Sequence, residues 1–152
     1  MSDRWVFLTA FLTVIVIVAG AFNMPHYFTF ELLKSLIFLA VALLVFFGED
    51  RFSYMLGIVA PILGFVLNIM LGGFFGEFKG LFNALTGKGS PLMSTPLHGL
   101  SLLLEIVLII VCYRAWRKQV TEKLFGKTFW ICLAVSIGYI AILVGWHFTH
   151  AL

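Results

Sequence analysis

Five apolar stretches, each long enough to cross a lipid bilayer, dominate this sequence of 152 residues. A membrane-spanning helix needs about 20 consecutive, mostly apolar residues. The five stretches that meet this requirement lie near residues 5–23, 28–47, 54–75, 97–113 and 128–149. Because 62% of the residues are hydrophobic and only 11% are charged, too few polar residues remain to cover such a core in water. The sequence therefore predicts an all-α, polytopic integral membrane bundle with five transmembrane helices, in which residues 1–152 form a single transmembrane domain.

The first apolar stretch has a second interpretation. Arg4 precedes it, and its end at Ala19-Gly20-Ala21 has the small residues that signal peptidases accept. The run from Trp5 to Phe22 is, however, longer than the apolar core of an ordinary signal peptide. We therefore expect a retained transmembrane helix, with a cleaved signal peptide as the alternative.

The segment between the third and fourth apolar stretches is too long for a simple turn. Its first half places apolar residues at i, i+3, i+4 and i+7, namely Phe78, Leu81, Phe82 and Leu85. This spacing is typical of a short amphipathic helix lying in the membrane surface, here near residues 77–86. Such a helix either covers the outer rim of the bundle or forms a mobile lid over it.

The positions of lysine and arginine predict the orientation, because positively charged loops stay on the cytoplasmic side. With a cytoplasmic N-terminus, seven of the ten basic residues lie inside: Arg4, Arg51, Arg114, Arg117, Lys118, Lys123 and Lys127. We therefore expect a protein of the cytoplasmic (inner) membrane with its N-terminus inside and its C-terminus outside. The basic cluster at residues 114–118 is interpreted as the anchor of a helix end, and no nucleic-acid partner is expected.

Three polar residues inside apolar stretches fall at a similar depth. At 1.5 Å per residue from the outer end of each stretch, Lys34 and Asn68 lie ~10 Å deep and Glu105 lies ~12 Å deep. Tyr139, in the last stretch, comes within about one turn of the same layer. An unpaired Glu105 would be costly in lipid, which predicts that it faces the bundle interior with Lys34 as its partner. Alternatively, Lys34 extends to the outer headgroups with help from Glu31.

Small residues predict where helices approach closely, because helices in lipid associate through packing and hydrogen bonds. The third stretch carries Gly57, Gly64, Asn68 and Gly72 along one side. We expect this side to contact another helix closely. The last stretch repeats the pattern with Ala134, Gly138 and Gly145.

All four histidines fall at the outer side in this topology: His26, His98, His147 and His150. Together they would be able to bind a transition metal or supply a haem ligand. The simpler interpretation is that they anchor helix ends at the interface, as amphipathic side chains do. No cofactor is expected under this interpretation, with a haem or a metal as the alternative.

No sequence motif specifies a reaction, and a nucleophile with a base at useful spacing is not evident, so an enzyme is not favoured. The polar layer predicts binding or passage of a small solute, ion or proton through an outward-facing cavity formed by Glu105, Lys34, Asn68, His98 and Tyr139. One alternative is a haem- or metal-binding subunit of a membrane redox complex. The other is a structural or assembly subunit. Membrane lipids, further copies of the chain or other membrane subunits are the expected partners.

Overall fold

The computed structural model describes residues 2–23, 25, 28–70, 79, 82–83, 85–87 and 96–150. Within these residues the chain forms five long α-helices and no β-strand. The helices are α1 (Ser2–Phe22), α2 (Phe28–Phe46), α3 (Asp50–Met70), α5 (Pro96–Gln119) and α6 (Lys127–His150). Each is long and apolar enough to cross a membrane, which confirms the expected all-α class with five candidate spans.

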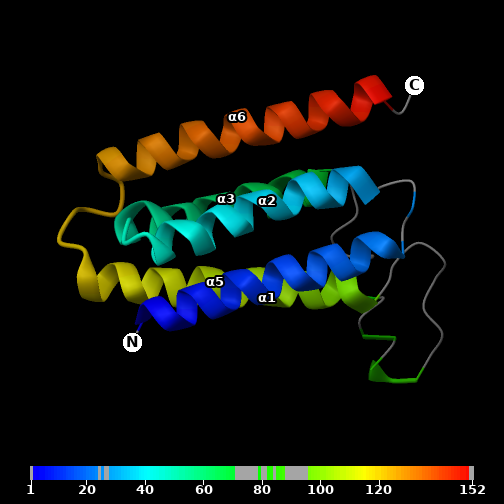
Figure 1. Cartoon of the computed structure of the whole chain (residues 1–152), viewed down its shortest axis with the longest axis horizontal. Helices are drawn as coiled ribbons and strands as arrows, with labels where there is room; N and C mark the ends of the chain where they lie inside the picture. Colours follow the sequence, from blue (N-terminus) through cyan, green and yellow to red (C-terminus); the bar gives the residue numbers. More distant parts are fainter. Residues whose placement is uncertain are drawn as a thin grey trace.

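The helices run side by side, and the two ends of the chain lie at opposite ends of the molecule (Figure 1). Four of them form a ring, because α1 contacts α2 and α5, and α3 contacts both of those helices as well. The fifth helix, α6, packs outside this ring, mainly on α3 and slightly on α2. Consequently α2 and α5 lie diagonally across the ring, and side chains that join them must meet near its centre.

Helices α3 and α5 extend furthest beyond the predicted apolar stretches, toward the polar end of the bundle. Helix α3 begins at Asp50 instead of residue 54, and α5 continues to Gln119 instead of ending near residue 113. Aspartate in a first turn and basic residues in a last turn favour helix by complementing the helix dipole, and the long Arg and Lys stems cover apolar surface. Helical structure therefore continues past the apolar stretches.

The predicted interfacial helix near residues 77–86 lies largely outside the described residues. Only Lys79, Phe82, Asn83, Leu85 and Thr86 of that segment are described. Residues 71–75, which the sequence places at the end of the third apolar stretch, also lie outside them. The outer-rim and lid interpretations of this segment thus stay predictions.

The link between α2 and α3 is a tight helix C-cap. Gly48 has a positive φ of 82°, which a residue without a Cβ adopts at little cost. Its N–H donates to the Val45 carbonyl at 3.1 Å, and the Glu49 N–H donates to the Leu44 carbonyl at 2.8 Å. These two bonds are the Schellman pattern, and they satisfy carbonyls that the end of α2 would leave exposed. The Ser53 hydroxyl then donates to the Val41 carbonyl at 2.8 Å and ties α3 back to α2.

Only part of the predicted glycine face makes close helix contact. A Cβ added at Gly57 would lie 2.5 Å from the Cys112 sulfur, so α3 and α5 approach closely there. A Cβ added at Gly64, Gly138 or Gly145 would meet no described atom within 4 Å. The prediction of close packing was therefore wrong at Gly64, Gly138 and Gly145, and Gly72 lies outside the described residues.

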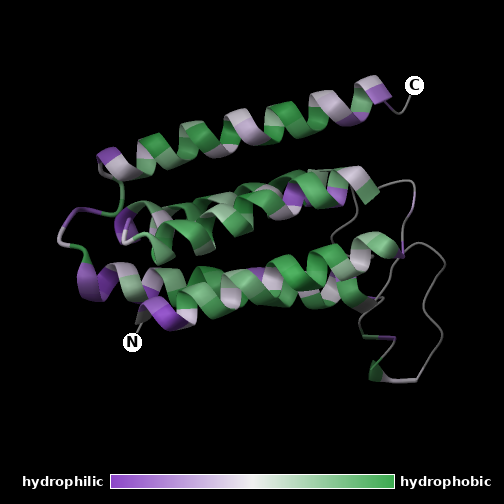
Figure 2. Ribbon diagram, in the orientation of Figure 1, coloured by the Kyte–Doolittle hydropathy of each residue, from purple (hydrophilic) through white to green (hydrophobic). Residues whose placement is uncertain are grey.

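Apolar side chains cover much of the outward surface of the helices, while hydrophilic residues gather toward their ends (Figure 2). Large hydrophobic residues are exposed on every helix, including Trp5, Phe46, Ile62, Ile110 and Ile142. Water would disfavour a surface of this kind, whereas lipid tails solvate it. The five apolar helices and this surface indicate a protein embedded in a membrane.

Candidate functional site

An ion pair crosses the centre of the helix ring. The Lys34 ammonium on α2 lies 3.9 Å from the nearer oxygen of the Glu105 carboxylate on α5. The Glu105 side chain is 2% exposed, whereas that of Lys34 is 26% exposed. The predicted pair is thus present, and Glu105 faces the bundle interior as expected.

A second contact between a basic and an acidic side chain joins the same two helices. His98 Nε2 on α5 lies 3.8 Å from a carboxylate oxygen of Glu31 on α2, and both side chains are largely buried. Glu31 precedes Lys34 by three residues, and His98 precedes Glu105 by seven. The four side chains therefore form a column of alternating acid and base between α2 and α5. We name this set the charge column.

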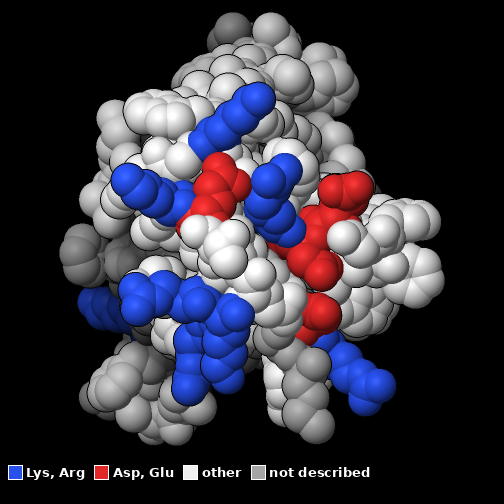
Figure 3. Space-filling view, turned by 90° about the vertical axis from the view of Figure 1, so that its left-hand side faces the viewer, with Lys and Arg blue, Asp and Glu red and all other residues white. Residues whose placement is uncertain are grey.

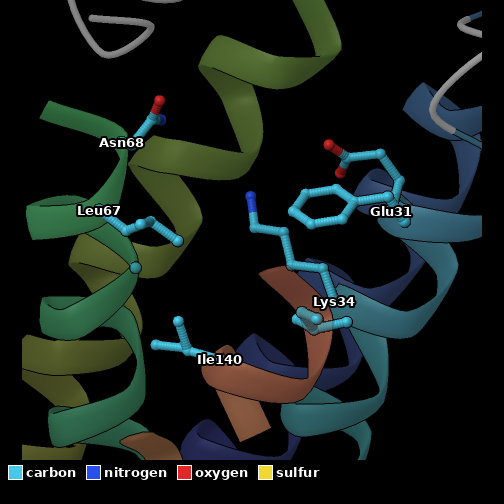
Figure 4. Close-up of a pocket in the computed structure, with 8 residues that line it drawn as sticks. Glu31, Lys34, Leu67, Asn68 and Ile140 are labelled. Carbon is cyan, nitrogen blue, oxygen red and sulfur yellow. The ribbon is translucent and has the colours of Figure 1, made fainter. Parts of the chain in front are cut away.

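A cavity of about 130 Å³ lies beside the charge column, between α2, α3 and α6. Its polar lining comes from Glu31, Lys34 and Asn68, and its apolar lining includes Phe30, Leu67, Ile140 and Leu143. Figure 4 shows the Lys34 ammonium projecting into this space between Leu67 and the Glu31 side of the cavity. Gly64 also lines the cavity, which explains why a Cβ there would meet nothing. The Lys34 side chain therefore faces both the cavity beside α6 and the Glu105 carboxylate inside the helix ring.

The structure places the five predicted site residues in one region but in different roles. Lys34 and Asn68 line the cavity, and Glu105 lies behind Lys34. His98 does not line the cavity and instead pairs with Glu31. Tyr139 donates a hydrogen bond to the Leu33 carbonyl and so attaches α6 to α2. Its position favours a role in holding α6 against the cavity.

The three described histidines lie in separate surroundings. His98 pairs with Glu31. The His147 ring packs edge-on against Phe30 with their centroids 5.3 Å apart, and the His150 ring stacks on Trp146 at 3.5 Å. His26 lies outside the described residues, and among those described no group of three metal-ligating side chains is found. The metal or haem alternative gains no support from this part of the chain.

A separate polar cluster at the other end of the bundle was not predicted. The Tyr54 hydroxyl on α3 is hydrogen-bonded to the Asp3 carboxylate on α1, and it lies 2.9 Å from Gln119 Oε1 on α5. The Gln119 side-chain amide donates to Asp3 at 3.1 Å. Tyr54 itself is fully buried. This cluster joins three helices of the ring. In the sequence, the only sign of it is that its three residues lie near helix ends at the same side of the membrane.

Replacing Tyr54 by Phe should lower the free energy of unfolding by about 1–3 kcal/mol, because the buried cluster loses its central hydroxyl. Tyr113→Phe is the matched control, since Tyr113 is exposed on α5. The check is unfolding of both variants in the same detergent. Equal stability of Tyr54→Phe and the unchanged protein would show that the cluster does not join the helices energetically.

Charged side chains gather at the same end of the molecule (Figure 3). Glu122, in the link between α5 and α6, accepts hydrogen bonds from the Thr128 hydroxyl at 2.8 Å and the Thr128 N–H at 3.2 Å. The Arg51 guanidinium lies 3.5 Å from the same carboxylate. The bonds from Thr128, helped by Arg51, lower the pKa of Glu122 below its usual value. Glu122 thus caps the start of α6 and joins it to α3.

The chain matches no protein-family model, no curated protein and no solved structure. Similar folds serve many functions, so the evidence for function lies in the geometry of the site. The charge column and its cavity offer the Lys34 ammonium, the Glu31 carboxylate in the lining, the Glu105 carboxylate behind Lys34, and an apolar wall. Such a site is suited to holding a small molecule that has one polar and one apolar part.

Proposed function

We propose that this protein is a membrane protein that binds a small amphipathic solute in the cavity between α2, α3 and α6, within the outer half of the bilayer. The observation that carries the proposal is the Lys34 ammonium projecting into a largely apolar cavity (Figure 4). The ammonium offers a polar contact to one part of a solute, and the apolar side chains around it suit the other part. Binding at this site is the step from which passage of the solute across the membrane would begin.

The orientation that we propose places the N-terminus in the cytoplasm. The start of α1, the α2–α3 turn and the α5–α6 link lie at the same end of the molecule (Figure 1). The basic residues expected on the inner side lie at the start of α1, at the start of α3, and from the last turns of α5 to the start of α6. Lys and Arg side chains gather at this end of the molecule (Figure 3). Positive charge favours the cytoplasmic side, so the cavity, near the other end, would be closer to the outside. Lipid would cover the exposed apolar side chains.

The size of the cavity limits the solute. A volume of about 130 Å³ is close to that of cavities that hold a single benzene ring. A molecule of this size gains at most about 1.5 kcal/mol for each non-hydrogen atom on binding. The expected dissociation constants for simple probes are therefore in the micromolar to millimolar range.

The test uses three butyl probes that differ in charge: butanesulfonate, butanesulfonamide and butylammonium. Their binding to the detergent-purified protein is measured by equilibrium dialysis, since short chains enter micelles poorly. At least one probe should bind, and Gly64→Leu should weaken that binding about tenfold or more by filling the cavity. The site tolerates the new side chain because a Cβ at Gly64 meets no described atom within 4 Å.

Gly138→Leu is the matched control. Gly138 is exposed on α6 and does not line the cavity, and a Cβ there also meets no described atom within 4 Å. This variant should bind the probe as the unchanged protein does. The proposal fails if none of the probes binds, or if Gly64→Leu and Gly138→Leu bind equally well.

A further inference from the structure

We infer that the cavity takes up an anionic solute together with one proton, and that Glu105 is the group that accepts the proton. The inference rests on the proposed function, since it names the charge of the solute that the same cavity binds. It follows from the place of Lys34 between the cavity on one side and the buried Glu105 carboxylate on the other.

Of the two charged side chains described in the cavity lining, Lys34 is more exposed than Glu31. The Lys34 side chain is 26% exposed, compared with 12% for Glu31 and 2% for Glu105. The Glu31 carboxylate is already attracted by Lys34 and lies 3.8 Å from His98 Nε2, which reduces its attraction for a solute cation. An entering solute therefore meets the ammonium first. The apolar wall formed by Phe30, Leu67 and Ile140 suits the remainder of an amphipathic anion.

The Lys34 ammonium already acts on two carboxylates, Glu105 and Glu31, so it cannot also balance a solute anion. This ammonium lies 3.9 Å from Glu105 and the side chain also lines the cavity, so a solute anion there can draw it away from the carboxylate. An ionised Glu105 would then be buried beside a second negative charge, which is strongly unfavourable in an apolar interior. One proton from the solvent adds to a Glu105 carboxylate oxygen and makes it a neutral carboxyl. The solute contributes one negative charge and the proton one positive charge, so the net charge of the site is unchanged.

The surroundings of Glu105 identify the groups that would take part. Lys34 faces it from α2, while Glu31, three residues before Lys34, pairs with His98, which precedes Glu105 by seven residues on α5. Tyr139 of α6 contacts the backbone of α2 beside Lys34. The helices packed on α5 add no further titratable group at this level. The titratable residues of α1 are Asp3 and Arg4, and those of α3 lie in the range 50–54. All of them are at the end of the bundle opposite to the cavity (Figure 1).

The experiment measures butanesulfonate binding as a function of pH, because this probe stays anionic across the whole range. Proton uptake predicts that affinity falls as pH rises, by up to tenfold per pH unit where free Glu105 is ionised and the bound form is protonated. Calorimetry in buffers of different ionisation enthalpy should find close to one proton taken up for each probe bound. Lys34→Met should lose the binding.

Two variants separate Glu105 from its neighbour His98. Glu105→Gln keeps the shape of a neutral carboxyl, so it should bind butanesulfonate with an affinity that no longer depends on pH and with no proton uptake. His98→Gln should keep both the pH dependence and the proton uptake. The inference is overturned if binding to the unchanged protein does not vary with pH, or if the dependence survives in Glu105→Gln.

The charge of the solute is tested in the same series. Binding of butylammonium without butanesulfonate would overturn the inference and still support a solute cavity. Failure of all three butyl probes would instead overturn the proposed function, on which the inference rests. The two failures are therefore distinguishable.

Discussion

Gly57→Leu is expected to prevent the normal packing of α3 against α5. A single Cβ at this position would already lie 2.5 Å from the Cys112 sulfur, and 3.5 Å from a Val41 methyl carbon. Adding side-chain volume to a well-packed core costs about 1–3 kcal/mol, and occasionally more. We expect about 3 kcal/mol here, because neighbours from two helices limit where the side chain can go. The measurement is unfolding in detergent, together with the yield of monodisperse protein.

Gly64→Leu on the same helix is the matched control for this prediction. It adds the same side chain where a Cβ would meet no described atom within 4 Å, so stability should change little. A smaller substitution at Gly57 tests whether the clash with the Cys112 sulfur causes the loss of stability. Gly57→Ala should destabilise modestly, and Cys112→Ala should offset part of that loss in the double variant by removing the sulfur. Equal stability of the two leucine variants would contradict the close α3–α5 approach.

The contrast between Gly57 and Gly64 shows what a sequence pattern can and cannot predict. The two glycines lie seven residues apart, so they share one side of α3. Spacing gives the side of the helix, but it does not give which neighbour lies opposite at each level. At Gly57 that neighbour is α5, whereas Gly64 borders the cavity toward α2 and α6. The pattern therefore predicted the packing at one glycine and failed at the other.

The five helices were predictable because each apolar stretch carries its own signal of length and hydropathy. The contact between Lys34 and Glu105 was predictable because depth along two helices restricts which charges can meet. The pair formed by Glu31 and His98 was missed, since it depends on α2 and α5 lying diagonally across the ring. Helix order around a bundle is not encoded by hydropathy. The partners of Tyr54 were missed for the same reason.

Lys34→Met is expected to destabilise the bundle by about 3 kcal/mol. Glu105 would lose its ammonium partner while staying 2% exposed, and removing one member of a buried ion pair typically costs about 3–5 kcal/mol. We expect the lower end of that range because Lys34 is partly exposed. The loss should shrink at low pH, where a protonated Glu105 carries no charge to bury. Unfolding in detergent at several pH values measures both effects.

Removing Glu105 should lower stability less than removing Lys34, so the two members of the pair are not equivalent. In Glu105→Leu the Lys34 ammonium can still reach the cavity, so the expected loss of stability is smaller than in Lys34→Met. Replacing both residues by apolar ones removes the buried charge, and the double variant should recover most of the stability lost in Lys34→Met. A double-mutant cycle measures the coupling. If Lys34→Met were as stable as the unchanged protein, or if the double variant did not recover, Glu105 would not depend on Lys34, and an anion drawing Lys34 away would give Glu105 no reason to take up a proton.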